Sequence, residues 1–214
     1  MRVVIAGGHG QIALQLERLL ADRGDSPVGI VRNPDHAADV EQAGAEAVVL
    51  DLEDTDAGTL AEVLTGADAV VFAAGGGPNS GAARKETVDK GAAVLLADAA
   101  EQAGVRRYVM ISATGVDRAD LDSDDVFQVY LRAKKAADDD LRARGLDWTV
   151  VRPGRLTNDP GTGHVQVGSR QRGAIPRADV AAVVAAALTM DPTIGKTFDL
   201  ISGDQTVEAA LAAL

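Results

Sequence analysis

Short apolar runs alternate along this chain with longer alanine- and leucine-rich segments, and this alternation restricts the possible folds more than any other feature of the sequence. The apolar runs are unbroken, which is typical of parallel strands covered by helices on both faces of a sheet. We predict strands at 3–6, 28–31, 47–50, 69–72, 107–111 and 148–151. We predict helices between them at 11–23, 35–43, 57–65, 83–103 and 128–144.

Glycines mark where these helices end. A glycine stands just after the last periodic residue of each predicted helix, at positions where a left-handed C-cap favours it: Gly24, Gly44, Gly66, Gly104 and Gly145. The agreement between periodicity and helix ends fixes the order of the elements. Repeated βα units in this order predict an α/β fold, a doubly wound parallel sheet of the Rossmann type.

The composition of the sequence changes from Arg152 onward, where frequent prolines and glycines indicate a stretch made mainly of loops. Beyond it we predict a strand at 164–167, a helix at 177–190, a strand at 197–201 and a last helix at 207–214. This part is too short for a second domain, so we expect one domain over 1–214. Residues 152–214 are then expected to cap the carboxyl edge of the sheet, where open α/β folds bind ligands.

Composition excludes several classes of function. The net charge of −11 disfavours nucleic-acid binding, which depends on lysine and arginine. With no cysteine, disulfides, thiolate metal sites and cysteine nucleophiles are absent. The histidines His9, His36 and His164 lack metal-ligand spacing, so we expect no metal.

The apolar segments are too short for the roughly 18 residues of a membrane-spanning helix, and the first strand runs directly into glycines rather than into a signal-peptide cleavage site. We therefore expect a cytoplasmic protein with a small-molecule substrate and neither a membrane nor a nucleic-acid partner. A monomer and a homodimer are both compatible with the sequence.

A glycine-rich turn, Gly7-Gly8-His9-Gly10-Gln11-Ile12-Ala13, follows the first strand and opens the first helix. A dinucleotide-binding fingerprint needs this context, because glycines let the backbone approach a pyrophosphate and the N–H groups at a helix start attract its charge. The alternative is a tight turn that binds nothing. We favour binding, since the alternating fold supplies a crevice beside the turn, and predict cofactor contacts from Gly7, Gly8, His9, Gly10, Gln11 and Ile12.

The end of the second strand bears on which dinucleotide binds. NAD-binding proteins usually place an acidic residue there, whereas this chain has Arg32 and Asn33. A guanidinium pairs well with a 2′-phosphate, so the sequence favours NADP (NADPH), with NAD possible. Arg32 as a solvated loop residue is the alternative.

Two further segments complete the predicted cofactor site. Asp51 and Leu52, after the third strand, are placed to flank the adenine, although an aspartate in this position is often a helix N-cap. The small residues Ala73, Ala74 and Gly75 follow the fourth strand and would let the nicotinamide ribose lie against the backbone. A flexible loop has the same composition.

A candidate catalytic pair lies in the predicted helix 128–144. Tyr130 and Lys134 are four residues apart and project from one helix face. A nearby ammonium lowers the pKa of a phenol, so this pair could exchange a proton with a carbonyl or an alcohol near neutral pH. Ser112, at the end of the fifth strand, would donate to the same substrate oxygen. The alternative is a chance spacing in which Tyr130 simply packs.

The sequence resembles a known family through its glycine turn and several later motifs: Val31-Arg32-Asn33-Pro34, Asp51-Leu52, Tyr108-Val109-Met110-Ile111-Ser112, Tyr130-Leu131-Arg132-Ala133-Lys134 with Ala137-Asp138, Trp148-Thr149-Val150-Val151-Arg152-Pro153-Gly154 and Ile175-Pro176-Arg177-Ala178-Asp179-Val180-Ala181. It is similar to the short-chain dehydrogenase/reductase superfamily, within it the atypical NAD(P)-binding, NmrA-like and biliverdin-reductase-like branch. The resemblance covers nearly the whole chain.

The resemblance implies roles for several of these residues. Gly7, Gly10, Arg32 and Asp51 would bind the cofactor, with Pro153 beside it. Ser112 and Tyr130 would face the substrate, and Lys134 would contact the nicotinamide ribose. Two positions depart from the family pattern: Ala13 replaces a third glycine, and Val88 stands where extended members often carry an asparagine.

The resulting functional expectation is an NADP(H)-dependent oxidoreductase that passes hydride to a quinone, a flavin or a carbonyl compound, with Tyr130 as the acid and Ser112 orienting the oxygen. The short C-terminal part would leave an open acceptor site suited to a flat or small substrate. Alternatives are a regulatory protein that senses NADP without turnover and an NAD(P)-dependent epimerase or dehydratase. The regulatory alternative needs neither Tyr130 nor Lys134.

Overall fold

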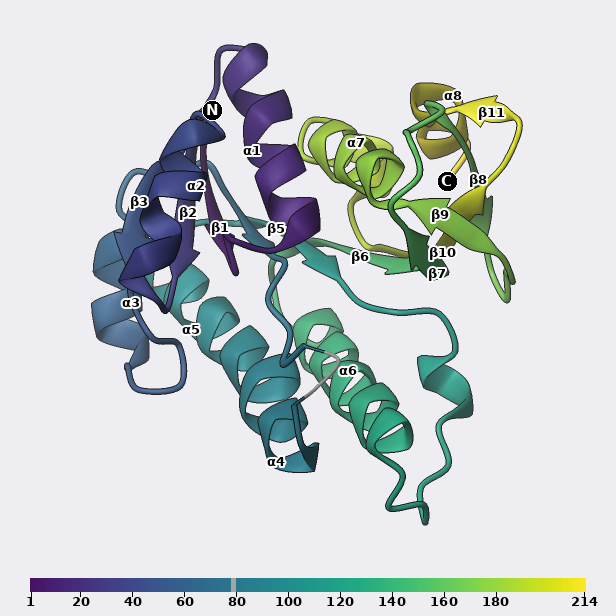
Figure 1. Ribbon diagram of the computed structural model, residues 1–214, viewed down its shortest axis with the longest axis horizontal. Helices are drawn as coiled ribbons and strands as arrows, with labels where there is room; N and C mark the ends of the chain where they lie inside the picture. The colour runs from purple at the N-terminus through teal and green to yellow at the C-terminus, as the bar shows by residue number, and fades with distance from the viewer. Residues whose placement is uncertain (78–79) are drawn as a thin grey trace.

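The computed structural model describes residues 1–77 and 80–214, and its main sheet has the predicted α/β arrangement (Figure 1). Its strands run in the order β11-β8-β10-β6-β5-β4-β1-β2-β3, and those from β10 to β3 are parallel. The parallel strands are β1 (Arg2–Ala6), β2 (Ser26–Val31), β3 (Glu46–Val49), β4 (Ala69–Phe72), β5 (Arg107–Ile111), β6 (Asp147–Pro153) and β10 (Lys196–Ser202). The chain reverses direction across the sheet between β1 and β4, and open α/β sheets bind ligands at such a reversal.

Helices cover both faces of the sheet (Figure 1). One face carries α1 (Gln11–Asp22), α7 (Arg177–Ala187) and α8 (Val207–Ala212), and the other carries α3 (Ala57–Val63), α5 (Ala93–Ala103) and α6 (Val126–Arg142). Alternate residues of β1 point into the two cores: Val3 and Ile5 pack with α1 and α7, whereas Val4 and Ala6 pack with α3 and α5. This double burial explains why the strands read as unbroken apolar runs.

Most predicted elements form within a few residues of their expected ends, with two differences. The predicted helix 35–43 divides into the 3-10 turn η1 (Pro34–His36) and α2 (Ala37–Gln42). The predicted helix 83–103 contains three segments in succession: α4 (Ala82–Arg84), the π-helical η2 (Lys85–Ala92) and α5. The capping glycines Gly24, Gly44, Gly66 and Gly104 have the expected positive φ, whereas Gly145 does not.

The C-terminal segment both extends the sheet and lines its carboxyl edge. Strand β10 adds beside β6, and β8 (His164–Gly168) and β11 (Gln205–Thr206) continue the sheet in antiparallel pairings. Two short strands that the sequence did not reveal, β7 (Arg155–Thr157) and β9 (Ala174–Pro176), pair separately. The turns η3 (Val116–Arg118) and η4 (Asp191–Thr193) complete the elements. Apolar side chains of β10, Phe198 and Leu200, join the core under α7, so this segment belongs to the same domain core.

Over residues 1–77 and 80–214, no helix combines the length and the apolar character needed to span a membrane. Within the same residues, no group of three or more histidines, aspartates or glutamates is arranged to hold a metal ion. The cavities at the carboxyl edge of the sheet are the candidate sites, because open α/β folds bind ligands there.

Candidate functional site

The glycine turn between β1 and α1 is packed so tightly that side chains would not fit. Gly7 has φ +84°, and a Cβ there would lie 2.6 Å from the backbone of Ala74. A Cβ on Gly8 would lie 2.7 Å from the Cα of Gly29. The glycines thus let the turn lie against β2 and against the segment after β4, as the fingerprint requires.

The hydrogen bonds of this turn separate its amides into two groups. The Gly7 and Gly8 amides donate to the Ile30 carbonyl, at 3.2 Å and 2.9 Å, and the Gly10 amide donates to the Gly7 carbonyl at 2.9 Å. Among the described residues, the amides of His9, Gln11 and Ile12 have no acceptor. Gln11 and Ile12 begin the twelve-residue α1, so their N–H groups lie at the positive end of a full helix. These three amides, rather than those of Gly8 and Gly10, can hold an anionic group.

A first cavity of about 410 Å³ opens beside the turn and contains most of the predicted cofactor residues. The predicted residues that line it are Gly7, His9, Gly10, Arg32, Asn33, Asp51, Leu52, Ala73, Ala74 and Gly75. Gly8 lies beneath the turn, Gln11 faces a separate surface hollow, and Ile12 lines the second cavity described below. The glycine turn, the end of β2 and the end of β3 therefore meet at this cavity, as predicted.

Arg32 does not stand alone in this cavity. Its Nη1 lies 3.1 Å from Oε2 of Glu53, which also accepts from Nη2 of Arg84 at 2.7 Å. The hydrogen bond from the Thr87 hydroxyl lowers the pKa of Glu53 most, and Arg84 lowers it further. Arg84 and Glu53 were missed by the sequence reasoning because nothing in their spacing connects them to Arg32. Because Glu53 contacts both arginines, two guanidinium groups lie at the end of β2.

Other predicted residues here have structural duties. The Asn33 side chain accepts from the Asp35 amide and caps η1, and Asp51 accepts from the Glu53 amide in a turn. His9 stacks on His36, with ring centroids 3.6 Å apart, and its Nε2 lies 2.7 Å from Asp39. Local hydrogen bonds and the stacked histidine rings thus shape the loops at the rim of the cavity.

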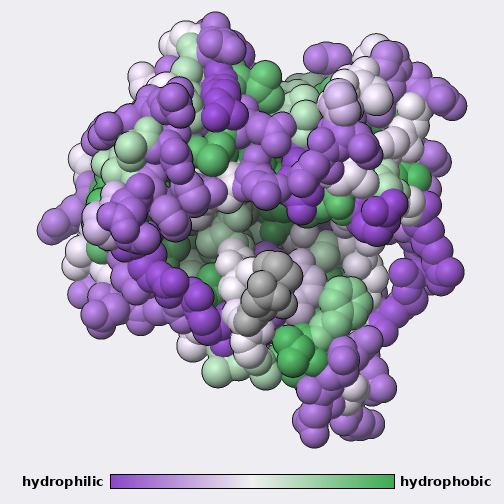
Figure 2. All heavy atoms as spheres, viewed as in Figure 1, coloured by the Kyte–Doolittle hydropathy of each residue, from purple (hydrophilic) through white to green (hydrophobic). Residues whose placement is uncertain are grey.

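A second cavity of about 670 Å³ adjoins the first, because Ala73, Ala74 and Gly75 line both. Five more predicted residues line it: Ile12, Ser112, Tyr130, Lys134 and Pro153. Figure 2 shows this face of the molecule hollowed near its middle, with pale and green residues inside the hollow. The structure therefore brings the predicted catalytic residues to a cavity continuous with the predicted cofactor residues.

Lys134 is buried at the floor of the second cavity and is paired with a residue that the sequence reasoning missed. Its Nζ lies 3.4 Å from Oδ1 of Asp89 and donates to the Ile111 carbonyl at 3.2 Å. Burial lowers the pKa of Lys134, while Asp89 raises it. Asp89 also accepts from the Gly76 amide at 3.1 Å, so it holds the loop after β4 against α6.

The environment of Tyr130 differs from the expectation that Lys134 lowers its pKa. Burial raises the pKa of Tyr130, and the carboxylates Asp89 and Asp138 raise it further. Asp89 is paired with Lys134 and opposes the effect of that ammonium on the phenol. Tyr130 is therefore held protonated, a form that donates a proton but does not accept one.

Lys85 also reaches the second cavity, from the π-helical segment η2. Its Nζ donates to the Gly77 carbonyl at 2.6 Å and lies 5.4 Å from the centre of the Tyr130 ring. In a π-helix each hydrogen-bonded turn takes one more residue than in an α-helix, which changes which side chains share a face. Here Lys85 and Asp89 reach this cavity, whereas Val88 lines the first.

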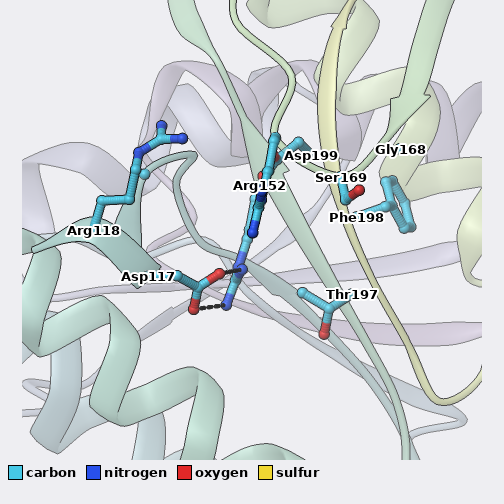
Figure 3. A pocket seen from close by; sticks show the side chains of 10 residues that line it. Asp117, Arg118, Arg152, Gly168, Ser169, Thr197, Phe198 and Asp199 are labelled. Atoms are coloured by element: carbon cyan, nitrogen blue, oxygen red, sulfur yellow. Dashed lines mark hydrogen bonds and ion pairs between the residues drawn. The ribbon is translucent and has the colours of Figure 1, made fainter.

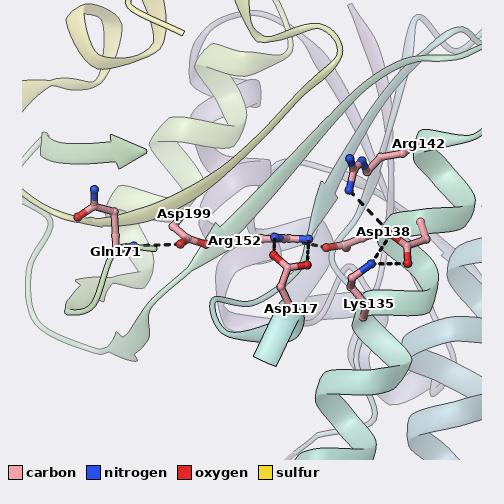
Figure 4. A network of polar contacts seen from close by, with 8 residues as sticks. Asp117, Lys135, Asp138, Arg142, Arg152, Gln171 and Asp199 are labelled. Carbon is pink, nitrogen blue, oxygen red and sulfur yellow. Dashed lines mark hydrogen bonds and ion pairs between the residues drawn. The ribbon is translucent and has the colours of Figure 1, made fainter. Parts of the chain in front are cut away.

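Ser112 lies beside a buried charged network behind the cavity. Arg152 donates from Nε to Asp138 at 2.9 Å and from Nη1 to Asp117 at 2.6 Å (Figure 4). Burial raises the pKa of Asp138, against the opposing effect of Arg152. The Ser112 hydroxyl lies beside Asp138 and lowers the pKa of that carboxyl, and Ser112 lines the second cavity.

A third cavity, of about 350 Å³, lies next to Arg152, between η3 and the start of β10 (Figure 3). Figure 3 shows Arg152 held by Asp117 on one side of it and Thr197, Phe198 and Asp199 on the other. None of the predicted site residues lines this cavity. The residues of the Arg-Pro-Gly motif thus have different roles. Arg152 belongs to the charged network, and Pro153 lines the second cavity.

Comparison with known proteins gives consistent results. A family model described as NAD(P)H-binding matches residues 7–191. A Bacillus subtilis protein, described as the uncharacterized sugar epimerase YhfK, is 38% identical over 216 residues, which cover 100% of both chains.

Two solved structures are also similar over nearly their whole length. One, from Bacillus halodurans, is provisionally named an NAD-dependent epimerase/dehydratase; it is 36% identical, has a TM-score of 0.91, and the match covers 100% of both chains. The other is described as the oxidoreductase ylbE from Lactococcus lactis; it is 27% identical, with a TM-score of 0.89 and coverage of 100% and 96%.

Proposed function

Because the chain belongs to the NAD(P)H-binding family, as its resemblance to atypical short-chain dehydrogenases/reductases led us to expect, we propose that it is an NADPH-dependent reductase. The observation that carries the proposal is the continuity of the two cavities: the glycine turn and Arg32 line the first, and Tyr130, Ser112 and Lys134 line the second. A dinucleotide bound along them would supply the hydride.

The residues present fit such a cofactor. The amides of His9, Gln11 and Ile12 would hold the pyrophosphate, and the glycines of the turn leave room for it. Arg32 and Arg84 would bind a 2′-phosphate in exchange for Glu53, which favours NADP over NAD. Lys134 would donate to the nicotinamide ribose from its buried position.

Protonated Tyr130 supports the reductive direction. Reduction of a carbonyl needs a proton donor at its oxygen, and a phenol whose pKa is raised stays protonated at neutral pH. Ser112, which lines the same cavity, would orient the same oxygen. The acceptor is proposed to be a quinone, a flavin or a carbonyl compound, because the cavity walls include Ile111, Val126 and Phe127.

The names of the relatives favour a second candidate, an NAD-dependent epimerase or dehydratase. Epimerisation through a ketone begins with removal of a proton from an alcohol, which requires the phenolate form of the tyrosine. The apolar lining of the second cavity argues against a sugar substrate. Formation of an epimer from a nucleotide sugar by the purified protein would reverse this preference.

The test is oxidation of NADPH in the presence of quinone, flavin and carbonyl acceptors. We expect turnover, and for the carbonyl compound we expect Tyr130→Phe to lower kcat by about 100-fold, a typical contribution of a positioned acid. Tyr108→Phe is the matched control, because Tyr108 is buried far from the cavity and its hydroxyl donates to the Ala93 carbonyl. Tight NADPH binding without turnover of any acceptor would support the regulatory alternative instead.

A further inference from the structure

Lys85 is a buried ammonium in the second cavity, and no carboxylate of the described residues balances its charge. Lys85 as a whole residue is only 5% exposed. It donates to one acceptor, the Gly77 carbonyl, and among the described residues no carboxylate lies within 4.0 Å of its Nζ. An ammonium carries three donor hydrogens, so within residues 1–77 and 80–214 this one has donors left for a ligand.

The charges around Lys85 add to a positive excess. The segment η2 and helix α6 bring together Lys85, Asp89 and Lys134, which makes two ammonium groups and one carboxylate. Asp138, the other nearby carboxylate, is paired with Arg152. Arg177 lines the same cavity, and its guanidinium donates to Asn158 rather than to a carboxylate. In a protein of net charge −11, this local excess of positive charge is unusual.

A buried charge without a counterion is costly, and a ligand of opposite charge removes that cost. We propose that the substrate of this cavity carries an anionic group, a carboxylate or a similar oxyanion, and that Lys85 binds it. This inference rests on the proposed function, because it takes the ligand beside Tyr130 to be the acceptor that is reduced. Lys85 is then a residue that determines specificity, at a distance from the reacting carbonyl.

The remaining walls describe the rest of the substrate. Ile12, Ile111 and Leu156 line the cavity with apolar side chains. Val126 and Phe127, at its mouth, are 40% and 60% exposed. These residues leave apolar surface that a ligand would cover. The substrate class is therefore a flat, apolar carbonyl or quinone compound with one acidic substituent.

A matched pair of acceptors tests the proposal: 1,2-naphthoquinone and its 4-sulfonate. We expect Lys85→Met to lower kcat/KM for the sulfonate at least 10-fold more than for the uncharged quinone, mainly through KM. Comparing the ratio between variants cancels the different redox potentials of the two compounds. Lys90→Met is the control, since Lys90 is an exposed residue of η2 that lies 3.6 Å from Glu86, and both acceptors should be turned over as by the wild type.

The result that overturns the proposal is an equal loss for both acceptors in Lys85→Met, mainly in kcat, which would place Lys85 at the reacting centre. Lys85→Arg should keep part of the preference for the sulfonate, because it keeps the charge. Melting temperature and NADPH affinity of each variant show whether a loss arises from misfolding.

A binding measurement separates this proposal from the proposed function. Calorimetry on the NADP-saturated protein compares naphthalene-2-carboxylate with naphthalene-2-carboxamide, neither of which is reduced. We expect the wild type to bind the carboxylate at least 10-fold more tightly and Lys85→Met to lose this difference. Equal binding by the wild type overturns the anion site even if quinones are turned over. A preference for the carboxylate without turnover of any acceptor contradicts the reductase and leaves the anion site standing.

Discussion

Glu17 is an acidic residue in a fully buried position. It lies on α1 under the glycine turn, is fully buried, and neither of its carboxyl oxygens has a partner among the described residues. Burial raises its pKa to about 8, against a small opposing effect of Arg18. The carboxyl group is therefore mainly neutral in the folded protein at pH 7, whereas it is ionised in the unfolded chain.

This difference predicts a stability that depends on pH. The unfolded chain releases the Glu17 proton near pH 4.5 and the folded protein near pH 8, so the free energy of unfolding falls as pH rises between these values. We expect urea unfolding to show that the wild type loses on the order of 3 kcal/mol more than Glu17→Gln between pH 5 and pH 8. The exposed Glu62→Gln should behave as the wild type does. Parallel pH profiles for Glu17→Gln and the wild type would disprove the burial of an uncompensated carboxyl group.

Arg32 and Arg84 predict the choice between the two dinucleotides. Because both contact Glu53, a 2′-phosphate would have to replace that carboxylate. We expect Arg32→Ala to weaken NADPH about 10-fold more than NADH, roughly 1.4 kcal/mol. We expect Glu53→Gln to strengthen NADPH more than NADH. Calorimetric titrations at fixed ionic strength measure both effects, with the exposed Arg142→Ala as control. An equal effect on the two nucleotides in both site variants would remove the argument for NADP.

At the scale of elements, strand β2 depends on the absence of a side chain at Gly29. A Cβ there would lie 2.6 Å from Oε1 of Glu17 and 2.8 Å from Cγ1 of Val40. We expect Gly29→Ala to destabilise the protein by about 1–3 kcal/mol in urea unfolding, the usual cost of overpacking. Gly145→Ala is the matched control, since a Cβ there meets nothing within 4 Å, and it should change stability by less than about 1 kcal/mol. Equal stability of the two variants would show that α1 and α2 can shift away from β2 without cost.

The elements themselves were largely predictable from the sequence. Strands at 69–72 and 107–111 have the predicted bounds, because their unbroken apolar runs are buried on both faces. The π-helical η2 was not predictable, since the periodicity of 83–103 also fits an ordinary α-helix. The π-helix has a functional consequence, because Asp89 rather than Val88 contacts Lys134. Val88 stands where extended family members often carry an asparagine, so the carboxylate of the next residue, Asp89, is the polar group on this segment beside Lys134.

The candidate site was predictable in its residues and less so in its electrostatics. The sequence identified Tyr130, Lys134 and Ser112, and the structure brings them to one cavity. It did not reveal that Asp89 balances Lys134 or that Glu53 contacts two arginines, because these contacts join residues far apart in the chain. The direction of the Tyr130 pKa shift follows from such contacts and from burial, neither of which the spacing of residues records.

At the scale of the whole molecule, the sheet order determines where the site lies. The reversal between β1 and β4 places the glycine turn next to the segment after β4, and the carboxyl end of β5 next to α6. The C-terminal segment extends the sheet through β10 and adds Pro153, Gly154 and Leu156 to the wall of the second cavity. One sheet thus supports a cofactor region and a substrate region that share their central residues.

The most direct test of this account is a two-dimensional amide NMR titration of the ¹⁵N-labelled protein with NADPH. The account predicts saturable shifts of the His9, Gln11 and Ile12 amide signals, because these free N–H groups would bind the pyrophosphate. The signals of Gly24 and Gly145, which lie outside the first and second cavities, should not move. Unchanged His9, Gln11 and Ile12 signals at millimolar NADPH would contradict it.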